Sequence, residues 1–309
     1  MRLRPWSVFV ALAATLAVVA GLPSPASAAA DRVLVIAADE PEHLSDVVDG
    51  LYETGRFSTV TVLVPGSSGC HAGTGTLSEA TLEEVDAVFV YGNCAMSSAV
   101  MDEVGDLLAD FVDAGGTVVV AHSATSCLSG VRLGGRWAAQ AYDAFAPSCD
   151  VAYDGPHFLL PVVEDHPLLA GVGSFWGGSI TARTHTTPQG GATVVATWSD
   201  LGMTPLLAQR EIGQGIVVGL NAFPVSSRVD DGFWSTGTDG WTLFANALQA
   251  VPQTSPQPQP APDPDDPVPG APTDPTDPAD PAAPGAPAPG DRPAAAPAHP
   301  VTAAPTFTG

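Results

Sequence analysis

Four short and almost entirely apolar runs, separated by segments with helical spacing, constrain the fold of this chain more than any other feature. The runs are RVLVIA (Arg32–Ala37), TVTVLV (Thr59–Val64), AVFVY (Ala87–Tyr91) and TVVVA (Thr117–Ala121). Runs without polar alternation are typical of strands buried on both faces, as in parallel sheets covered by helices. We therefore predict an α/β fold with a doubly wound, mainly parallel sheet.

The segments between and after these runs fit the same fold. Apolar residues recur at helical spacing in His43–Thr54, which Gly55 is suited to end, and again in Met101–Val112. The later half predicts strands separated by Gly-rich turns and then a closing helix, with an antiparallel extension at one edge of the sheet. These elements are Phe158–Val163, Thr193–Thr197, Pro205–Gln209, Gly215–Leu220 and the helix Trp241–Ala250.

Both ends of the chain differ from this body. Residues 1–28 have the pattern of a signal peptide: two arginines, an apolar run over Trp6–Gly21 and the small-residue site Ala26-Ser27-Ala28. Cleavage after Ala28 is expected, with cleavage after Ala30 and an uncleaved membrane anchor as alternatives. Residues 29–251 form the predicted domain, and residues 252–309 form a Pro/Ala/Asp-rich tail whose composition predicts disorder. We expect a secreted or extracytoplasmic protein without a membrane span after cleavage.

The charge balance excludes one class of partner. The sequence has 33 acidic residues against 10 basic ones, all of them arginine, for a net charge of −23. Such a field repels phosphate backbones, so no nucleic-acid partner is expected. A small molecule or a cell-surface glycan is compatible with this charge.

Four cysteines, Cys70, Cys94, Cys127 and Cys149, are spaced without a C-x-x-C pair. Zinc binding and thioredoxin-like redox chemistry are therefore poorly supported, and an even number in an oxidising compartment favours two disulfides. We predict Cys70–Cys94 and Cys127–Cys149, because each bridge then closes one surface loop. A Cys94–Cys127 bridge is the main rival, since both residues follow strands that end at the same sheet edge.

Polar side chains follow several predicted strands, where ligands bind to open parallel sheets. These candidates for a ligand cleft are Asp39, Glu40, Asn93, His122, Ser123 and Asn221. The segment GGTVVVAHSA at 115–124 runs from a strand into a turn of small residues, the pattern of a nucleophile elbow, with His122 or Ser123 at its apex. If the protein is an enzyme, we expect His122 and Ser123 to be catalytic, with Asp39 or Glu40 orienting His122.

The same segment resembles the class I glutamine amidotransferase-like superfamily and, within it, the ThuA-like branch. In that branch a Gly-Gly strand also ends in a histidine where the amidotransferases have their catalytic cysteine. The resemblance continues in HPLLAGV at 166–172 and in TPLLAQR at 204–210, followed by GQGIVVGL at 213–220. It implies a flavodoxin-like, glutamine-amidotransferase-like fold over residues 32–251.

The departures from that superfamily shape the functional hypotheses. Amidotransferases use a cysteine with a His-x-Glu pair, and the chain has no His-x-Glu sequence and His122 at the elbow. We therefore favour an exported, non-catalytic ligand-binding or interaction domain without glutaminase activity. The alternative is a secreted hydrolase, related to carbohydrate metabolism, that uses His122 and Ser123. No cofactor is expected, and a metal held by His122 with Asp39 or Glu40 lacks any supporting spacing.

Overall fold

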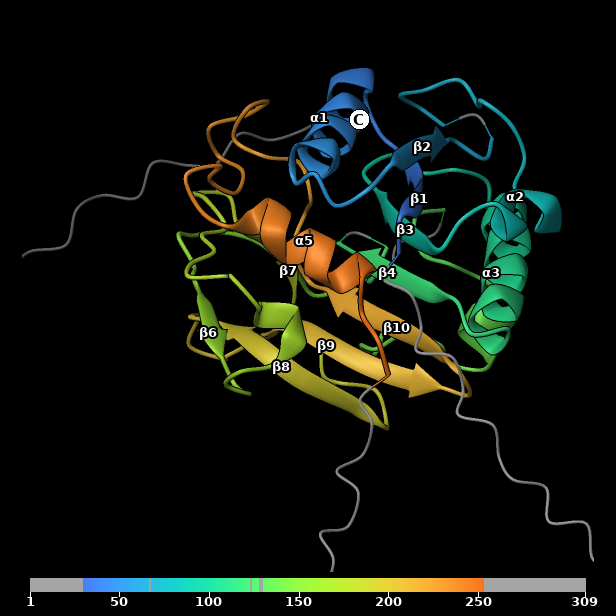
Figure 1. Cartoon of the computed structure of the whole chain (residues 1–309). Coiled ribbons are helices and arrows are strands. Elements are labelled where there is room, and N and C mark those ends of the chain that lie inside the picture. The colour runs from blue at the N-terminus through green and yellow to red at the C-terminus, as the bar shows by residue number, and fades with distance from the viewer. Residues whose placement is uncertain (1–29, 67, 123, 128–129, 253–309) are drawn as a thin grey trace, which may run out of the picture. The chain divides into compact units, whose positions relative to one another are not determined.

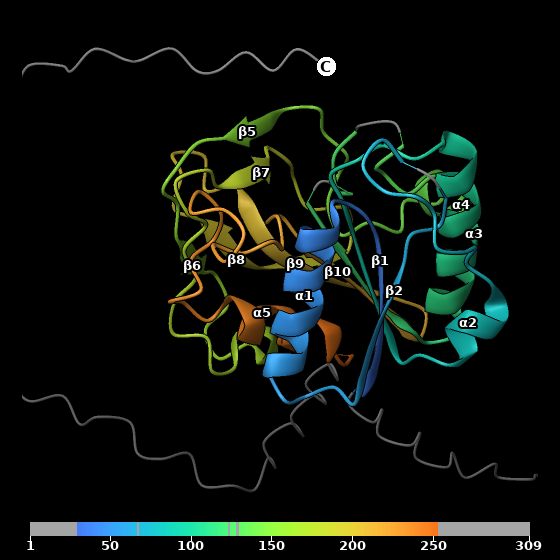
Figure 2. The ribbon, with the colours of Figure 1, turned by 90° about the horizontal axis from the view of Figure 1, so that it is seen from above.

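The computed structural model describes residues 30–66, 68–122, 124–127 and 130–252. The expected signal peptide, Ser123 and the expected tail from residue 253 onward lie outside the described residues. Eight strands form one sheet in the order β2–β1–β3–β4–β10–β9–β8–β6 (Figure 1). Strands β5 and β7 pair in a second, two-stranded sheet (Figure 2). The predicted α/β class, with a mainly parallel sheet, is confirmed.

The first five strands of the large sheet run parallel. They are β2 (Thr59–Leu63), β1 (Arg32–Ala38), β3 (Ala87–Gly92), β4 (Thr117–Ala121) and β10 (Gly215–Leu220). Every residue of β3, β4 and β10 is buried. This explains the absence of polar alternation in these runs, because each strand has a helix-covered or loop-covered surface on both faces.

The remaining strands extend the sheet with antiparallel pairing, as the sequence predicts. They are β9 (Pro205–Ile212), β8 (Ala192–Trp198) and the short edge strand β6 (Leu159–Pro161). Strands β9 and β10 form a hairpin in which Ile212 pairs with Gly215. The turn between them uses Gly213 at φ 60°, a left-handed conformation that glycine adopts without strain.

Helices cover both faces of the parallel half (Figure 2). On one face, α1 (Pro41–Glu53) and α5 (Gly240–Leu248) bury Leu51 and Phe244 in a core cluster with Val35 of β1. On the other face, α2 (Glu79–Glu83), α3 (Ser98–Asp113) and α4 (Gly135–Ala139) contribute to the cluster that contains Leu34. A 3-10 turn over Pro167–Leu169 packs near α5.

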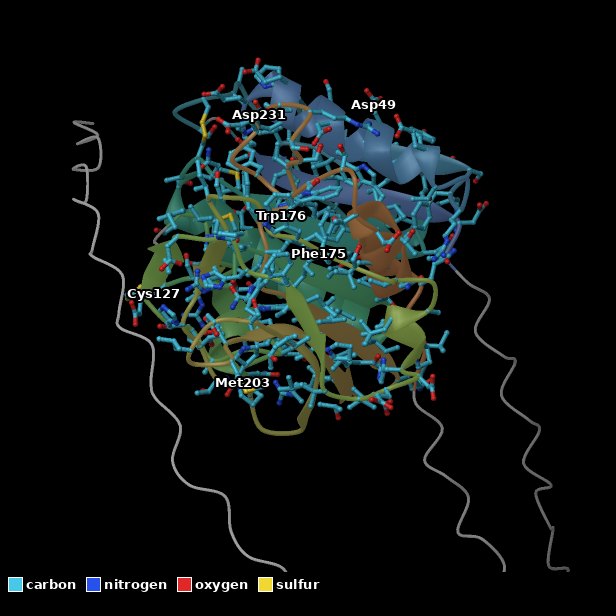
Figure 3. All side chains as sticks on the ribbon, turned by 90° about the vertical axis from the view of Figure 1, so that its left-hand side faces the viewer. Asp49, Cys127, Phe175, Trp176, Met203 and Asp231 are labelled. Carbon is cyan, nitrogen blue, oxygen red and sulfur yellow. A yellow bond between two sulfur atoms is a disulfide. The ribbon has the colours of Figure 1, made fainter. Side chains whose placement is uncertain are left out.

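Two disulfides tie together the loops at one edge of the sheet. Cys70, after β2, is bonded to Cys94, after β3, with their Cα atoms 6.1 Å apart. Cys127, after β4, is bonded to Cys149, just before β5 (Val151–Tyr153), with their Cα atoms 5.0 Å apart (Figure 3). The predicted pairing is confirmed over the rival Cys94–Cys127 pairing. Within the described residues, we find no helix with the length and apolar character that a bilayer crossing requires.

Candidate functional site

The carboxyl ends of β1, β3, β4 and β10 lie at one edge of the sheet because these strands are parallel. In the register of the sheet, Ala38 of β1 is level with Gly92 of β3, and Val120 of β4 is level with Val90. Chain order reverses at β1, which has β2 on one side and β3 on the other. Ligands of open α/β sheets bind at such an edge, near such a switch point.

Asp39 and Asn93, which follow β1 and β3, are brought together at this edge. Asp39 Oδ1 accepts a hydrogen bond from the backbone of Glu40 at 2.9 Å and lies 3.4 Å from Asn93 Nδ2. The same oxygen lies 2.8 Å from Nδ1 of His43. Because α1 begins at Pro41, His43 follows Asp39 by one helical turn and its ring reaches back to the carboxylate. The Glu40 side chain is exposed.

The hydrogen bond with Asp39 raises the pKa of the His43 imidazole above its ordinary value, against the opposing effect of partial burial. Aromatic side chains surround this pair. The His43 ring lies edge-on to Phe223 and Phe233, with ring centroids 6.1 and 6.0 Å away, and Phe223 also lies edge-on to Tyr91 at 6.2 Å. Burial raises the pKa of the Tyr91 phenol well above its ordinary value, so the phenol stays protonated.

His122 and Asn221, which follow β4 and β10, meet at Thr184 of β7 (Ala182–Thr184). His122 Nδ1 lies 3.2 Å from Thr184 Oγ1. The Asn221 side chain accepts from the backbone N–H of Thr184 at 2.8 Å and donates to its carbonyl, also at 2.8 Å. Burial lowers the pKa of His122 to about 4, so this imidazole is neutral near pH 7.

The segment after β10 contacts both the His122 backbone and the Asp39–His43 pair with its aromatic neighbours. The backbone N–H of His122 donates to the carbonyls of Leu220 and Ala222, at 3.0 and 3.3 Å, and the next residue, Phe223, contacts His43 and Tyr91. The prediction that Asp39 or Glu40 orients His122 is wrong, since neither carboxylate contacts the His122 ring. The His122 ring has Thr184 as its partner. The Asp39 carboxylate is bound instead to His43 in the first turns of α1.

Four buried polar atoms at this edge have no hydrogen-bond partner in the part of the chain that the structure describes. They are Asp39 Oδ2, the Tyr91 hydroxyl, His122 Nε2 and Thr125 Oγ1. The four residues are 0%, 2%, 1% and 4% exposed, so water does not solvate these atoms from outside. Other unpartnered buried atoms of the described residues, such as Thr197 Oγ1 and Gln209 Oε1, lie on β8 and β9. Buried polar groups in native proteins are nearly always paired, so the four at the carboxyl ends of β1, β3 and β4 are candidates for contact with a ligand.

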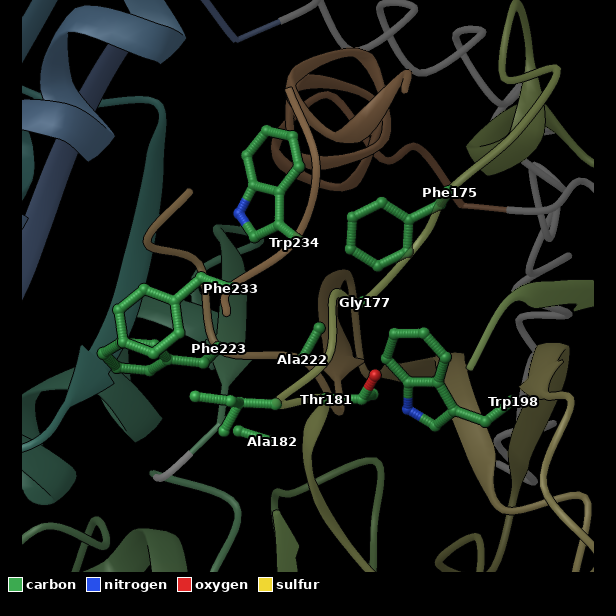
Figure 4. Close-up of a pocket in the computed structure, with 10 residues that line it drawn as sticks. Phe175, Gly177, Thr181, Ala182, Trp198, Ala222, Phe223, Phe233 and Trp234 are labelled. Atoms are coloured by element: carbon green, nitrogen blue, oxygen red, sulfur yellow. The ribbon is translucent and has the colours of Figure 1, made fainter. Parts of the chain in front are cut away.

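The aromatic cluster beside Phe223 is packed too tightly to be that site. A cavity of about 10 Å³ lies among Phe175, Gly177, Ile180, Thr181, Ala182, Trp198, Ala222, Phe223, Phe233 and Trp234 (Figure 4). This volume accommodates about one water molecule, so the cluster is core packing. A larger open groove, of about 440 Å³, lies next to Asn221 and is lined by Ser148, His185, Thr186 and Thr204, among others.

Three residues of the edge were missed from the sequence. His43 has a local signal, since it follows Asp39 by four residues at the start of a helix. Tyr91 is the last residue of a predicted strand, and its side chain was not separated from the core. Thr184 has no local signal, because β7 comes from a distant part of the chain. Among the described residues, no group of three His, Cys, Asp or Glu side chains is placed to hold a metal ion.

Comparison with known proteins finds a similar fold among solved structures. No family model and no curated protein sequence matches the chain. Among solved structures, a cytoplasmic protein from Salmonella typhimurium LT2 superposes with a TM-score of 0.52 at 11% identity, over 72% of this chain and 100% of that protein.

Two further structures superpose with a TM-score of 0.48. A second cytoplasmic protein of Salmonella typhimurium has 14% identity over 71% of this chain and 98% of its own. A protein described as thuA-like, from Parabacteroides merdae ATCC 43184, has 15% identity over 74% of this chain and 93% of its own. Only the likeness to the first of these three proteins exceeds a TM-score of 0.5. At 11% identity that likeness establishes the α/β fold and assigns no activity.

Proposed function

We propose that this protein is exported and that its folded domain binds a small polar molecule at the carboxyl edge of β1, β3 and β4. The domain is then a ThuA-like member of the class I glutamine amidotransferase-like superfamily that has kept the ligand edge of the fold and lacks glutaminase activity. The ligand is a free small molecule or one terminal unit of a cell-surface glycan.

The observation that carries this proposal is the set of four buried, unpartnered atoms on Asp39, Tyr91, His122 and Thr125. Leaving a buried polar atom without a partner costs about 1–3 kcal/mol, and four such atoms together are a large cost for one domain. A bound molecule with matching donors and acceptors removes this cost. Groups of this kind are retained where binding requires them, at the expense of stability.

The chemistry available at the edge supports binding over glutaminase activity. All four cysteines are in disulfides. The elbow position holds His122, which is buried and neutral near pH 7. Glutamine hydrolysis of the superfamily type needs a thiolate and an adjacent base, and neither is available at this position.

Hydrolysis is the second candidate, and the Asp39–His43 pair is the observation that favours it. A carboxylate 2.8 Å from Nδ1 fixes the orientation of the ring and stabilises its protonated form, as in the base of a nucleophilic triad. In this alternative His122 and Ser123 act in catalysis with His43 as a further base. The measurement is turnover of chromogenic esters and glycosides, which His43→Gln should abolish if the alternative is correct.

The test of binding uses the unpartnered hydroxyl groups. Ligands are identified by incubating the mature protein with a mixture of polar metabolites and oligosaccharides, and analysing retained compounds by mass spectrometry. Thr125→Val and Tyr91→Phe should each stabilise the ligand-free protein, by about 1 kcal/mol, because they remove a buried unpartnered group. Both variants should also weaken binding of the retained compound by about tenfold.

Thr197→Val is the matched control. Thr197 is buried on β8 and its hydroxyl also has no partner among the described residues. It lies three strands away from β4, about 14 Å at the usual spacing of strands. This variant should stabilise the protein without changing binding. Equal losses of affinity in all three variants, or none in any of them, would contradict the proposed site.

A further inference from the structure

We infer that the ligand of this edge carries a protonated amine, and that its nitrogen binds beside Asp39 Oδ2 and the Tyr91 hydroxyl. The inference rests on the proposed function and names the chemical class of the ligand.

The first argument is the asymmetry of the Asp39 carboxylate. Its Oδ1 atom is close to three donors: the Glu40 backbone N–H, His43 Nδ1 and Asn93 Nδ2. Its Oδ2 atom has none within the described residues, although Asp39 is fully buried. An ionised carboxylate accepts hydrogen bonds through both oxygens, so the missing partner of Oδ2 is a donor, and a charged donor satisfies it best.

The second argument is what surrounds that oxygen. The Tyr91 hydroxyl is buried without a partner and stays protonated, so its oxygen offers a second acceptor to a group with several N–H donors. Besides burial, the Asp39 charge contributes to the raised pKa of the Tyr91 phenol, so the carboxylate and the hydroxyl act on the same region of the edge.

The third argument excludes anionic ligands. The sequence contains no lysine. In the described chain no arginine lies within ion-pair distance of Asp39, and each arginine has a contact of its own elsewhere. These contacts are Arg32 with Asp86, Arg56 with Asn246, Arg132 with Asp143, Arg136 with Asp110 and Asp113, Arg183 with Asp154 and Asp200, Arg210 with the Ala141 carbonyl, and Arg228 with Glu53. A phosphate or carboxylate at this edge would lack a cationic partner.

Access to Asp39 passes through Asn93 and His43. The Asn93 side chain is exposed, and its 3.4 Å contact is the longest and weakest of the three to Oδ1. The His43 side chain is 12% exposed. The Asn93 contact is therefore the one that an entering polar group displaces most easily.

His43 makes the binding of a cation dependent on pH. The charged and titratable groups around it are Asp39, Glu40 and Glu42 near the start of α1, Asp46 one turn further, and Tyr91 on β3. Below the pKa of His43 its imidazolium neutralises Asp39 and competes with the ligand. Above that pKa the imidazole is neutral and no longer competes with the ligand. Amine binding should therefore tighten as pH rises and displace a proton from His43.

The experiment compares three probes with the same butyl chain: n-butylammonium, 1-butanol and pentanoate. Binding to the mature full-length protein is followed at pH 8 through the ring C–H signals of the histidines in NMR spectra. We expect n-butylammonium to shift the His43 signal and to bind at least tenfold more tightly than 1-butanol, with no saturable effect of pentanoate. Between pH 8 and pH 5 the affinity for n-butylammonium should fall at least fivefold.

Three variants distinguish a direct contact with the Asp39 carboxylate from the long-range effect of removing one negative charge. Asp39→Asn should weaken n-butylammonium binding at least tenfold. Asp49→Asn removes the same charge from an exposed position of α1 and should change it by less than twofold. His43→Gln keeps a donor for Asp39 and should remove the pH dependence, which tests the inference even if Asp39→Asn does not fold.

The results distinguish this inference from the proposed function. Tighter binding of 1-butanol or pentanoate than of n-butylammonium, with shifts at His43 or His122, would overturn the inference and leave the binding site in place. No saturable shift at either histidine with any probe would contradict both.

Discussion

At the scale of single residues, the hydrogen bonds of two buried carboxylates, Asp46 and Asp39, show what is unusual about this edge. Asp46 on α1 is buried and receives hydrogen bonds on both oxygens from Ser226, at 2.7 Å from the backbone N–H and 3.0 Å from the hydroxyl. Asp39, seven residues earlier in the chain, is also buried, but only its Oδ1 atom has hydrogen-bond partners among the described residues. The fold can therefore satisfy a buried carboxylate completely, and the unpartnered Oδ2 of Asp39 is the contrast on which the proposed binding role rests.

His122 should make the protein less stable in acid. Burial lowers its pKa from 6.5 to about 4, so the unfolded chain binds a proton at this position more readily than the folded one. Stability from this group is then full above pH 6.5 and declines as pH falls toward 4. Between pH 7.5 and 4.5 we expect His122→Gln to lose about 2 kcal/mol less than the wild type, measured by urea unfolding. An equal decline in both proteins would show that His122 is not buried as a neutral ring.

Asn221 should be one of the most sensitive positions for stability. Its buried amide bonds to the N–H and carbonyl of Thr184 and to the carbonyl of Pro205, the last at 2.9 Å. Asn221→Ala leaves these backbone groups buried without partners, and we expect a loss of about 3 kcal/mol in the free energy of unfolding. Asn93→Ala, at an exposed position, should cost less than about 0.5 kcal/mol. Similar costs for the two variants would be inconsistent with this network.

At the scale of elements, the sequence predicts what local pattern determines and misses what distant contacts determine. Strands β4 and β10 match their predicted limits residue for residue. Each is a short apolar run next to glycine, a pattern that favours a buried strand and marks where it begins. The predicted helix at His43 begins earlier, at Pro41, since proline is well suited to the first helical turn. Strands β5 and β7 were missed because three residues carry no pattern, and their pairing depends on tertiary contacts.

The candidate site divides in the same way. Asp39 and Asn93 could be placed together because parallel strands end at one edge, and the structure has them in contact. The partners of His122 and Asn221 could not be predicted, since both bind Thr184 of the missed strand β7. α4 was also missed: it starts at Gly134-Gly135, which the sequence alone favours as a turn.

The disulfides should each stabilise the loops at the ligand edge. Cys70–Cys94 and Cys127–Cys149 close segments with sequence separations of 24 and 22 residues. Restriction of the unfolded chain by loops of this length is worth about 3 kcal/mol per bridge. We expect that loss from Cys127→Ser with Cys149→Ser, and a similar one from Cys70→Ser with Cys94→Ser, measured by urea unfolding. A Cys94–Cys127 peptide in a non-reducing digest would contradict the pairing.

At the scale of the whole molecule, charge and fold restrict function in different ways. The fold is shared with a Salmonella protein at 11% identity, and a shared fold does not identify a ligand. The net charge of −23 acts over the whole surface and disfavours polyanions. In the proposed function, recognition of the ligand comes from the few buried polar groups at the edge of β1, β3 and β4.

The mature protein should release no ammonia from glutamine. The superfamily reaction requires a thiolate at the elbow, activated by a histidine and assisted by an oxyanion hole. Here the elbow has His122, and the four cysteines are all bridged. Because nucleophile and base act as a unit, the absence of both removes most of the rate and leaves no partial activity of comparable size.

The assay is ammonia release from glutamine by the purified mature protein, with the double variant His122→Ala, Ser123→Ala as the control. Equal and background-level rates in the two proteins are expected. Turnover by the wild type that is lost in the double variant would contradict the prediction. Because His122 is neutral near pH 7 and cannot replace a thiolate, such turnover would assign the nucleophile to Ser123 and favour the hydrolase over the binding domain.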